Sequence, residues 1–125
     1  MNKSLIIALI LLVVVITGGV LEFVLVGKEY KKFEKQVEVY KQKAFDKTIT
    51  NENVIDMKKQ WIKLRELSEL FLPHIDTYEL NLRITDCTAF VELKDYKNAY
   101  NQLSIIAMLA EYIPNLAVPD IQHVI

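Results

Sequence analysis

The sequence predicts an all-α protein in which an N-terminal transmembrane helix, a signal-anchor, continues into an amphipathic helix and is followed by a small helical bundle. Three observations predict it. Residues 5–26 form a nearly unbroken apolar run, apolar residues recur at spacings of three and four through most of the remainder, and every glycine lies at or before residue 27. Strand-like alternation and glycine-centred hairpin turns are missing beyond that point.

The composition excludes several classes of protein. The chain has 125 residues, 52% of them hydrophobic, with 3 Gly, 3 Pro and 1 Cys. Collagen-like, low-complexity and disulfide-rich scaffolds need far more Gly, Pro or Cys than this. The formal net charge of −1 excludes a strongly basic nucleic-acid binder, so no nucleic-acid partner is expected.

The apolar run at residues 5–26 is long enough to cross a bilayer, with residues 1–4 as a short tail before it. A helix of this length spans roughly 33 Å at about 1.5 Å per residue, against a hydrocarbon core of about 30 Å. Its single ionisable residue, Glu22, lies four residues before the end of the run, roughly 6 Å from the boundary, where it can reach the head groups. Membrane lipid is therefore the first expected partner.

The same segment also resembles a cleavable signal, because Lys3 precedes the apolar stretch and Thr17-Gly18-Gly19 follows it. We favour an uncleaved anchor, since apolar residues continue to Val26; secretion after cleavage is the alternative. The lysines beyond residue 26 favour a cytoplasmic domain by the positive-inside rule, whereas the short tail and signal-like run are typical of export. We expect a single-pass protein of the cell membrane with an extracytoplasmic domain.

Residues 27–46 are predicted to form an amphipathic helix that extends the anchor. Apolar residues recur there at heptad spacing over about three heptads, the lower limit for a coiled coil. This stripe has two interpretations: packing against later helices of the same chain, which we favour, or self-association. Its members are Phe23, Val26, Tyr30, Phe33, Val37, Tyr40 and Ala44.

Charge is distributed unevenly along the chain. Residues 27–65 hold 11 basic and 6 acidic residues, whereas residues 66–125 hold 3 basic and 9 acidic ones. A solvated helix surface explains the lysine-rich part most simply. The functional interpretation is attraction to anionic lipid or to an anionic cell-wall polymer.

Two further helices are predicted at about 53–72 and 77–93. Asn53 is a suitable N-cap for the first, and Pro73 should end it, because proline disfavours the helical conformation of the residue before it. Asp76 and Glu79 have the spacing of a capping box for the second. The expected buried faces comprise Val54, Met57, Trp61, Leu64, Ser68 and Phe71, then Leu80, Ile84, Cys87 and Val91.

A fourth helix is predicted at about 95–113, with Asp95 as N-cap and Pro114 at its end, which closes an all-α domain over residues 27–114 and leaves 115–125 as a tail. The short turn before Asp95 makes the last two helices an αα-hairpin. Aromatic residues at helical spacing are interpreted as core and core-edge residues, or as a protein-binding patch if several are exposed together. They are Trp61, Phe71, Tyr78, Phe90, Tyr96, Tyr100 and Tyr112.

The chain resembles the family of small bacterial proteins known as domain of unknown function 4363. The residues that carry the resemblance are the anchor with Gly18-Gly19 and Glu22, the Trp61-centred helix, the junction Leu72-Pro73-His74-Ile75-Asp76 and the closing Tyr112-Ile113-Pro114. The resemblance implies a membrane-anchored or exported helical protein, with no catalytic residues to carry over. It also implies a multi-spanning membrane protein as a partner.

Few residues offer chemistry. The chain has two histidines and one cysteine, without the spacing of a zinc site, so we expect no metal, no cofactor, no catalytic residues and no enzyme. His74 lies at the predicted bend, where it could bond Asp76 or Glu79 as a latch or contact a ligand beside Arg83. We expect an accessory or protein-interaction module at the bacterial cell envelope. The alternative is an exported soluble domain that binds a small ligand or anionic wall polymer.

Overall fold

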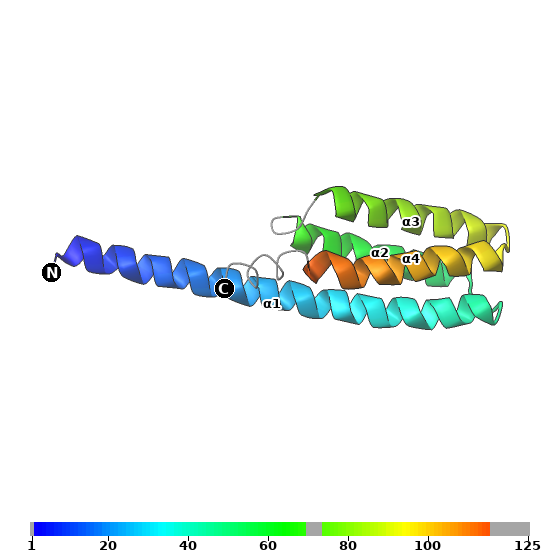
Figure 1. Cartoon of the computed structure of the whole chain (residues 1–125), viewed down its shortest axis with the longest axis horizontal. Coiled ribbons are helices and arrows are strands. Elements are labelled where there is room, and N and C mark those ends of the chain that lie inside the picture. The colour runs from blue at the N-terminus through cyan, green and yellow to red at the C-terminus, as the bar shows by residue number, and fades with distance from the viewer. Residues whose placement is uncertain (1, 70–73, 116–125) are drawn as a thin grey trace.

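A computed structural model describes residues 2–69 and 74–115 and contains four helices in this part of the chain. They are α1 (Lys3–Phe45), α2 (Asn51–Ser68), α3 (His74–Glu92) and α4 (Tyr96–Asn115). Figure 1 shows α2, α3, α4 and the second half of α1 lying side by side as a bundle. The predicted all-α class is confirmed.

The first helix is continuous from the apolar run into the bundle. It has 43 residues and is N-capped by Asn2, whose Oδ1 accepts a hydrogen bond from the Ser4 N–H at 3.3 Å. Its N-terminal part is long and apolar enough to span a membrane or serve as a signal, and it projects alone from the bundle (Figure 1). The predicted continuation of the apolar segment into the amphipathic helix is confirmed.

The four helices are arranged in chain order around the bundle. Helix α1 packs against α2 and α4, and α3 packs against the same two helices, with the most extensive contacts between α1 and α4. Successive helices run in opposite directions, as in an up-down-up-down bundle (Figure 1). The predicted antiparallel α3–α4 hairpin is therefore present.

The core is centred on Trp61 of α2, which is fully buried. Its ring meets Tyr30 edge-on at 6.2 Å between centroids and Phe33 at 5.9 Å. The Tyr30 hydroxyl donates to Ser68 Oγ at 3.2 Å, and Ser68 donates in turn to the Arg65 carbonyl at 3.1 Å. Burial raises the pKa of Tyr30 to about 12, so its hydroxyl keeps its proton across the physiological range.

The heptad stripe of α1 is part of this core. Its members from Val26 to Ala44 are buried, and the α1 contacts are with α2 and α4 of the same chain. The structure therefore shows the first of the two interpretations, packing within the bundle. The side chain of Phe23, the remaining member, lies outside the described residues.

Two predicted helix starts are wrong. Helix α2 begins at Asn51 rather than at about residue 53, because Thr50 is the N-cap: its Oγ1 accepts from the Asn53 N–H at 3.3 Å, and Asn53 Oδ1 accepts from the Thr50 N–H at 3.0 Å. Helix α3 begins at His74, which places Asp76 inside the helix rather than at the cap. The expected Asp76–Glu79 capping box is therefore wrong.

The other helix ends also differ in detail. The Asp95 cap of α4 is confirmed, since its Oδ1 accepts from the Asn98 N–H at 3.3 Å. Helix α4 continues to Asn115 with Pro114 in its last turn, where the missing N–H costs one hydrogen bond without ending the helix. Helix α2 ends at Ser68, short of the predicted residue 72; residues 70–73 lie outside the described part.

Lysine occupies a left-handed backbone position after α1 and again after α3. Lys47 has a φ of 60° and Lys94 a φ of 57°. At the second site the Asp95 N–H donates to the Phe90 carbonyl at 2.8 Å and the Lys94 N–H to the Val91 carbonyl at 3.0 Å, the two bonds of a Schellman motif. Glycine adopts this conformation without steric cost, whereas a residue with a Cβ is disfavoured.

Lys94→Gly is therefore expected to raise the free energy of unfolding by about 0.5–1 kcal/mol, a gain that the larger entropy of glycine in the unfolded chain partly offsets. Urea unfolding of the full chain in detergent, followed by circular dichroism, measures it. Lys94→Ala removes the same charge and keeps the Cβ, so it should show no such gain. Equal stability of the two variants would contradict the argument.

Candidate functional site

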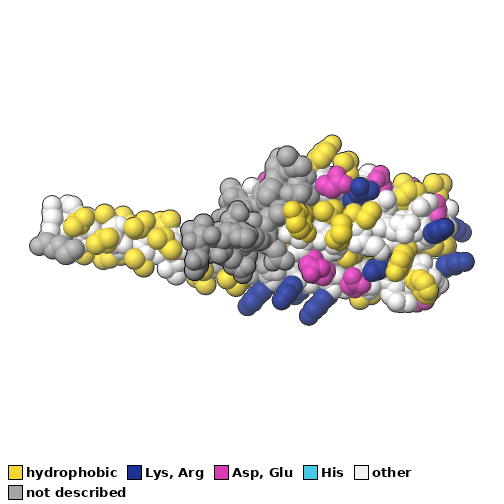
Figure 2. Space-filling model, viewed as in Figure 1, with side chains coloured by type: hydrophobic (Ala, Val, Ile, Leu, Met, Phe, Trp, Pro, Cys, Tyr) yellow, Lys and Arg dark blue, Asp and Glu magenta, His cyan; other side chains and the backbone are white. Residues whose placement is uncertain are grey.

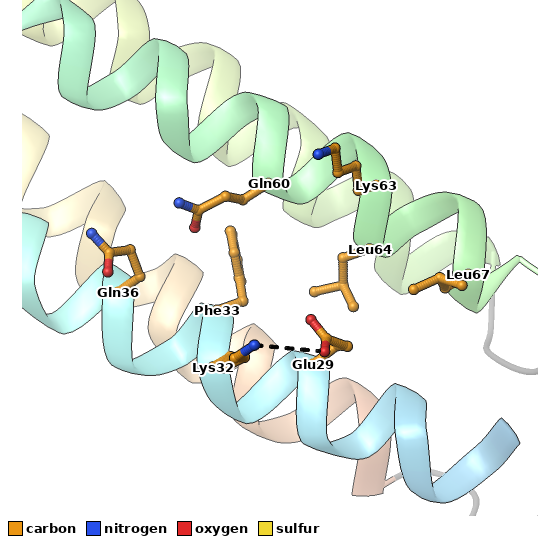
Figure 3. A pocket seen from close by; sticks show the side chains of 8 residues that line it. All are labelled: Glu29, Lys32, Phe33, Gln36, Gln60, Lys63, Leu64 and Leu67. Carbon is orange, nitrogen blue, oxygen red and sulfur yellow. Dashed lines mark ion pairs between the residues drawn. The ribbon is translucent and has the colours of Figure 1, made fainter. Parts of the chain in front are cut away.

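A groove lies between α1 and α2, with a volume of about 320 Å³. Phe33 and Leu64 are almost fully buried and point into the space between the helices from opposite sides (Figure 3). Polar side chains surround this apolar floor. The lining residues are Glu29, Lys32, Phe33, Gln36, Gln60, Lys63, Leu64 and Leu67.

The groove lies in the half of the bundle nearest the apolar segment. The Tyr30–Ser68 hydrogen bond places the end of α2 beside the first bundle turns of α1. Glu29 and Leu67 accordingly lie at the end of the groove toward the apolar segment, and Gln36 and Gln60 lie at the opposite end (Figure 3). Leu67 is 53% exposed.

The groove is weakly cationic. Lys32 and Lys63 are exposed and contribute two positive charges, against one negative charge from Glu29. The Lys32–Glu29 ion pair is long, 4.0 Å between Nζ and Oε1, and both side chains are exposed, so it contributes little to stability. The ammonium groups and the amides of Gln36 and Gln60 thus offer hydrogen-bond donors beside an apolar floor.

A second, smaller hollow lies at the far end of the bundle, where α1 meets the start of α4. Its volume is about 240 Å³. Lys41 already engages the groups there, with Nζ 3.7 Å from a Glu38 carboxylate oxygen and 5.5 Å from the centre of the Tyr100 ring. Phe45 packs on the same ring at 6.0 Å. These contacts join α1 to α4, so we assign the residues of this hollow a structural role in the bundle.

Apolar side chains are exposed on the outer surface of the last hairpin. Tyr78 and Leu82 of α3 lie one helical turn apart, as do Met108 and Tyr112 of α4, and all four are exposed. Figure 2 shows hydrophobic side chains gathered along α4 and over α3. The core interpretation is confirmed for Trp61, but Tyr78 and Tyr112 are more than half exposed.

The predicted latch residues are only partly described. The side chains of His74 and Asp76 lie outside the described residues, so a latch between them stays a prediction. Glu79 and Arg83, four residues apart on α3, form an ion pair, with Glu79 Oε1 2.9 Å from both Arg83 Nε and Nη2. Arg83 Nη1 also donates to Gln102 Oε1 at 3.4 Å, which connects α3 to α4.

The single cysteine is buried in the core on α3. Burial raises the pKa of Cys87 to about 12, so its thiol is protonated and unreactive at neutral pH. In the described parts of the chain, no group of three or more His, Cys, Asp or Glu side chains is placed to hold a metal ion. Cys87 fits the role of a small apolar core residue.

Three carboxylates of α1 and α4 lie near one another. Burial raises the pKa of Glu34, the charges of Glu111 and Glu38 raise it further, and Lys31 lowers it. A carboxyl group with a raised pKa in the folded state destabilises the fold when ionised, and this cost disappears as the pH falls through that pKa toward the ordinary value.

We therefore expect Glu34→Gln to stabilise the protein at pH 7 by about 0.2–0.5 kcal/mol, the size of like-charge contacts on helix surfaces. Thermal unfolding of both proteins between pH 3 and 8 measures the difference, which should vanish on the acid side of the ordinary glutamate range. Glu66→Gln, at an exposed residue of α2 away from its N-terminus, provides the control. A gain that is independent of pH would exclude this explanation.

Comparison with known protein families finds one family whose sequence model covers the bundle. A family model described as Domain of unknown function (DUF4363) matches residues 25–124. The chain belongs to this family. The match begins next to Val26, a buried member of the α1 stripe, and leaves out most of the apolar run. No curated protein and no solved structure matches the chain.

Sequence reasoning missed the groove. Lys32 and Lys63 stand out only as exposed lysines, and Leu67 only as a residue that widens the apolar face of its helix. The sequence signal that could have found them is the combination of an apolar residue, Leu67, with Lys63 on the same helix and Lys32 on a second helix that packs against Trp61. That signal becomes specific only when the distance between α1 and α2 is known.

Proposed function

We propose that the protein is a single-pass, membrane-anchored interaction module at the bacterial cell envelope, with its bundle outside the cytoplasm. The observation that carries the proposal is the continuity of α1, which forms the apolar segment and one side of the bundle in a single helix. Such a helix would hold the bundle at a fixed height above the bilayer. An adaptor that meets a membrane protein needs this fixed placement.

The outer surface of the last hairpin is the contact region in this proposal. Tyr78 lies near the start of α3 and Tyr112 lies in the last turn of α4, so both are close to the end of the bundle nearest the apolar segment (Figure 1). Exposed aromatic residues close to the bilayer suit a second membrane protein, because tyrosine combines a large apolar ring with a polar hydroxyl. A multi-spanning protein of the same membrane is the proposed partner.

Site-specific photocrosslinking in native membranes tests this contact. A photoreactive amino acid at Tyr112 should give one adduct of defined mass with a multi-spanning protein, and Met108→Asp should abolish that adduct. The same amino acid at Lys59, an exposed residue of α2, should not give it. Identical adducts from Tyr112 and Lys59, or a yield unchanged by Met108→Asp, would overturn the proposed surface.

The competing function is an exported, soluble domain that binds a small ligand or wall polymer. Its support is that, among the described side chains of α1, the buried ones begin at Val26, so cleavage after Gly19 would keep all of these core residues. Intact-mass measurement of the protein from membranes and medium separates the two functions. A full-length mass in membranes supports the anchored module, and a shortened protein in the medium supports the soluble domain.

Labelling of a single added cysteine tests the side of the membrane. In a Cys87→Ser background, a membrane-impermeant maleimide should label Lys59→Cys in cells with intact membranes. Labelling that appears only after the cells are opened would place the bundle in the cytoplasm. The natural Cys87 is buried and would react only if the bundle unfolded. Its replacement ensures that any label is attached to the added cysteine.

A further inference from the structure

We propose that the α1–α2 groove binds the head group of an anionic phospholipid, an inference that rests on the proposed retention of the membrane anchor. The groove would hold the lipid phosphate between Lys32 and Lys63 and the first part of an acyl chain against Leu67. Three features of the described residues carry the proposal: the height of the groove above the bilayer, its combination of charge and apolar surface, and the weak engagement of Lys32.

The height follows from the continuity of α1. If the hydrocarbon core ends at about Val26, a rise of about 1.5 Å per residue places Glu29 roughly 4.5 Å beyond the boundary and Lys32 roughly 9 Å beyond it. The head-group layer on each side of a bilayer is about 5–7 Å thick. The membrane end of the groove, with Glu29 and Leu67, therefore lies in this layer. The backbone of Lys32 lies just beyond the layer, and its ammonium group reaches back toward it, to 4.0 Å from Glu29 Oε1.

The lining suits an amphiphile better than a wholly polar ligand. Lys32 and Lys63 provide cationic donors for a phosphate, and the amides of Gln36 and Gln60 can bond glycerol oxygens. Phe33 and Leu64 form the apolar floor of the groove, and the exposed Leu67 adds apolar surface at its membrane end. A glycerol phosphodiester without acyl chains would leave Leu67 in water, so we commit to the lipid rather than to a wall polymer.

Lys32 is available for such a ligand. Its only described ion pair is with Glu29, at 4.0 Å, and its side chain is 79% exposed. A phosphate that binds both lysines would displace this weak contact, because a charge-assisted hydrogen bond to a phosphate oxygen is shorter and stronger. Glu29 then acts as a competitor for Lys32, and its removal should strengthen lipid binding.

Native mass spectrometry of the full-length protein, released from phosphatidylcholine nanodiscs that contain phosphatidylglycerol, tests the site. The double variant Lys32→Gln/Lys63→Gln should lose phosphatidylglycerol binding about tenfold more than Lys31→Gln/Lys35→Gln. The second variant is the matched control, because it removes two exposed lysines near the same height that do not line the groove. Equal losses would show diffuse surface attraction and overturn the proposal.

Three further measurements test the role of Glu29, the nature of the ligand and the membrane anchor separately. Glu29→Gln should increase binding about two- to threefold, and a decrease would contradict the assigned competition. Soluble glycerophosphoglycerol should not displace the lipid; displacement would assign the site to a wall-type phosphodiester instead. Sedimentation of the parent protein with vesicles reports the anchor separately. A parent protein that sediments but does not bind phosphatidylglycerol overturns the groove alone, whereas a parent protein that fails to sediment overturns the proposed membrane anchor.

Discussion

Trp61→Ala is expected to lower the free energy of unfolding of the bundle by about 3–5 kcal/mol, the range for truncation of a large aromatic residue in a core. Trp61 is fully buried and packs on Tyr30 and Phe33, so its removal opens a cavity where α1 and α2 meet. Small domains have total stabilities of about 5–15 kcal/mol, so this one change removes a large fraction.

Urea unfolding followed by circular dichroism measures the loss, since the variant has no tryptophan left to fluoresce. Ile55→Ala on the same helix is the matched control, because Ile55 is about half exposed and should cost less than about 1 kcal/mol. Similar losses for the two variants would show that Trp61 is not the centre of the core.

Trp61→Phe separates packing from hydrogen bonding at the same position. The indole Nε1 is buried and lacks a hydrogen-bond partner among the described residues. A buried N–H without a partner costs about 1–3 kcal/mol, and phenylalanine removes this group along with part of the ring volume. We therefore expect Trp61→Phe to be much less destabilising than Trp61→Ala. A loss as large as that of alanine would mean that the indole makes a bond in solution.

The sequence predicted the faces of the helices better than their partners. Apolar spacing identified the α1 stripe because helical periodicity is a local property, and the stripe members from Val26 to Ala44 are buried as expected. Whether they pack on the same chain or on a second copy depends on helices far along the chain. Periodicity alone cannot separate these two cases.

Helix caps show where local reasoning reaches its limit. Thr50 and Asn53 are both good N-cap residues, and only their reciprocal hydrogen bonds show that Thr50 is the cap. In α3 the same spacing of Asp76 and Glu79 fits a capping box, yet the helix begins earlier and Glu79 pairs with Arg83. An acidic residue near a helix start satisfies either arrangement, so residue type alone does not decide between them.

The contacts of the candidate site also differ in how far the sequence can predict them. The Glu79–Arg83 pair was predictable because the residues lie four apart on one helix, whereas the bond from Arg83 to Gln102 joins two helices. The groove depends on the separation of α1 and α2 at Phe33 and Leu64, which no spacing within either helix specifies. Contacts within one helix can therefore be read from the spacing of residues, whereas the site between two helices cannot.

Gly27→Pro should disconnect the bundle from the apolar segment without removing either part. Gly27 lies inside α1, one residue after Val26, a buried member of the stripe. Proline there removes the hydrogen bond to the carbonyl of residue 23 and places its ring against that carbonyl, at a cost of about 3 kcal/mol that bends or breaks the helix. The parent protein and the Gly27→Pro variant should both still sediment with membranes, because residues 5–26 are unchanged.

Gly27→Ala is the matched control for this break. A Cβ added at Gly27 meets no atom within 4 Å, and alanine in place of a helical glycine should stabilise α1 by about 0.5–1 kcal/mol. Energy transfer from a dye at Lys59→Cys, in the Cys87→Ser background, to acceptors in the bilayer reports the height of the bundle. The height distribution should be narrow for the parent and for Gly27→Ala, and broad for Gly27→Pro.

The same pair of variants connects the height of the bundle to its contacts. If a fixed height brings Tyr112 to a membrane partner and the α1–α2 groove to lipid head groups, Gly27→Pro should weaken both the Tyr112 crosslink and phosphatidylglycerol binding. Gly27→Ala should preserve both. A proline variant with a broad height distribution and undiminished contacts would show that the two surfaces work without the continuous helix, and the proposal of a rigid membrane-anchored module would lose its main support.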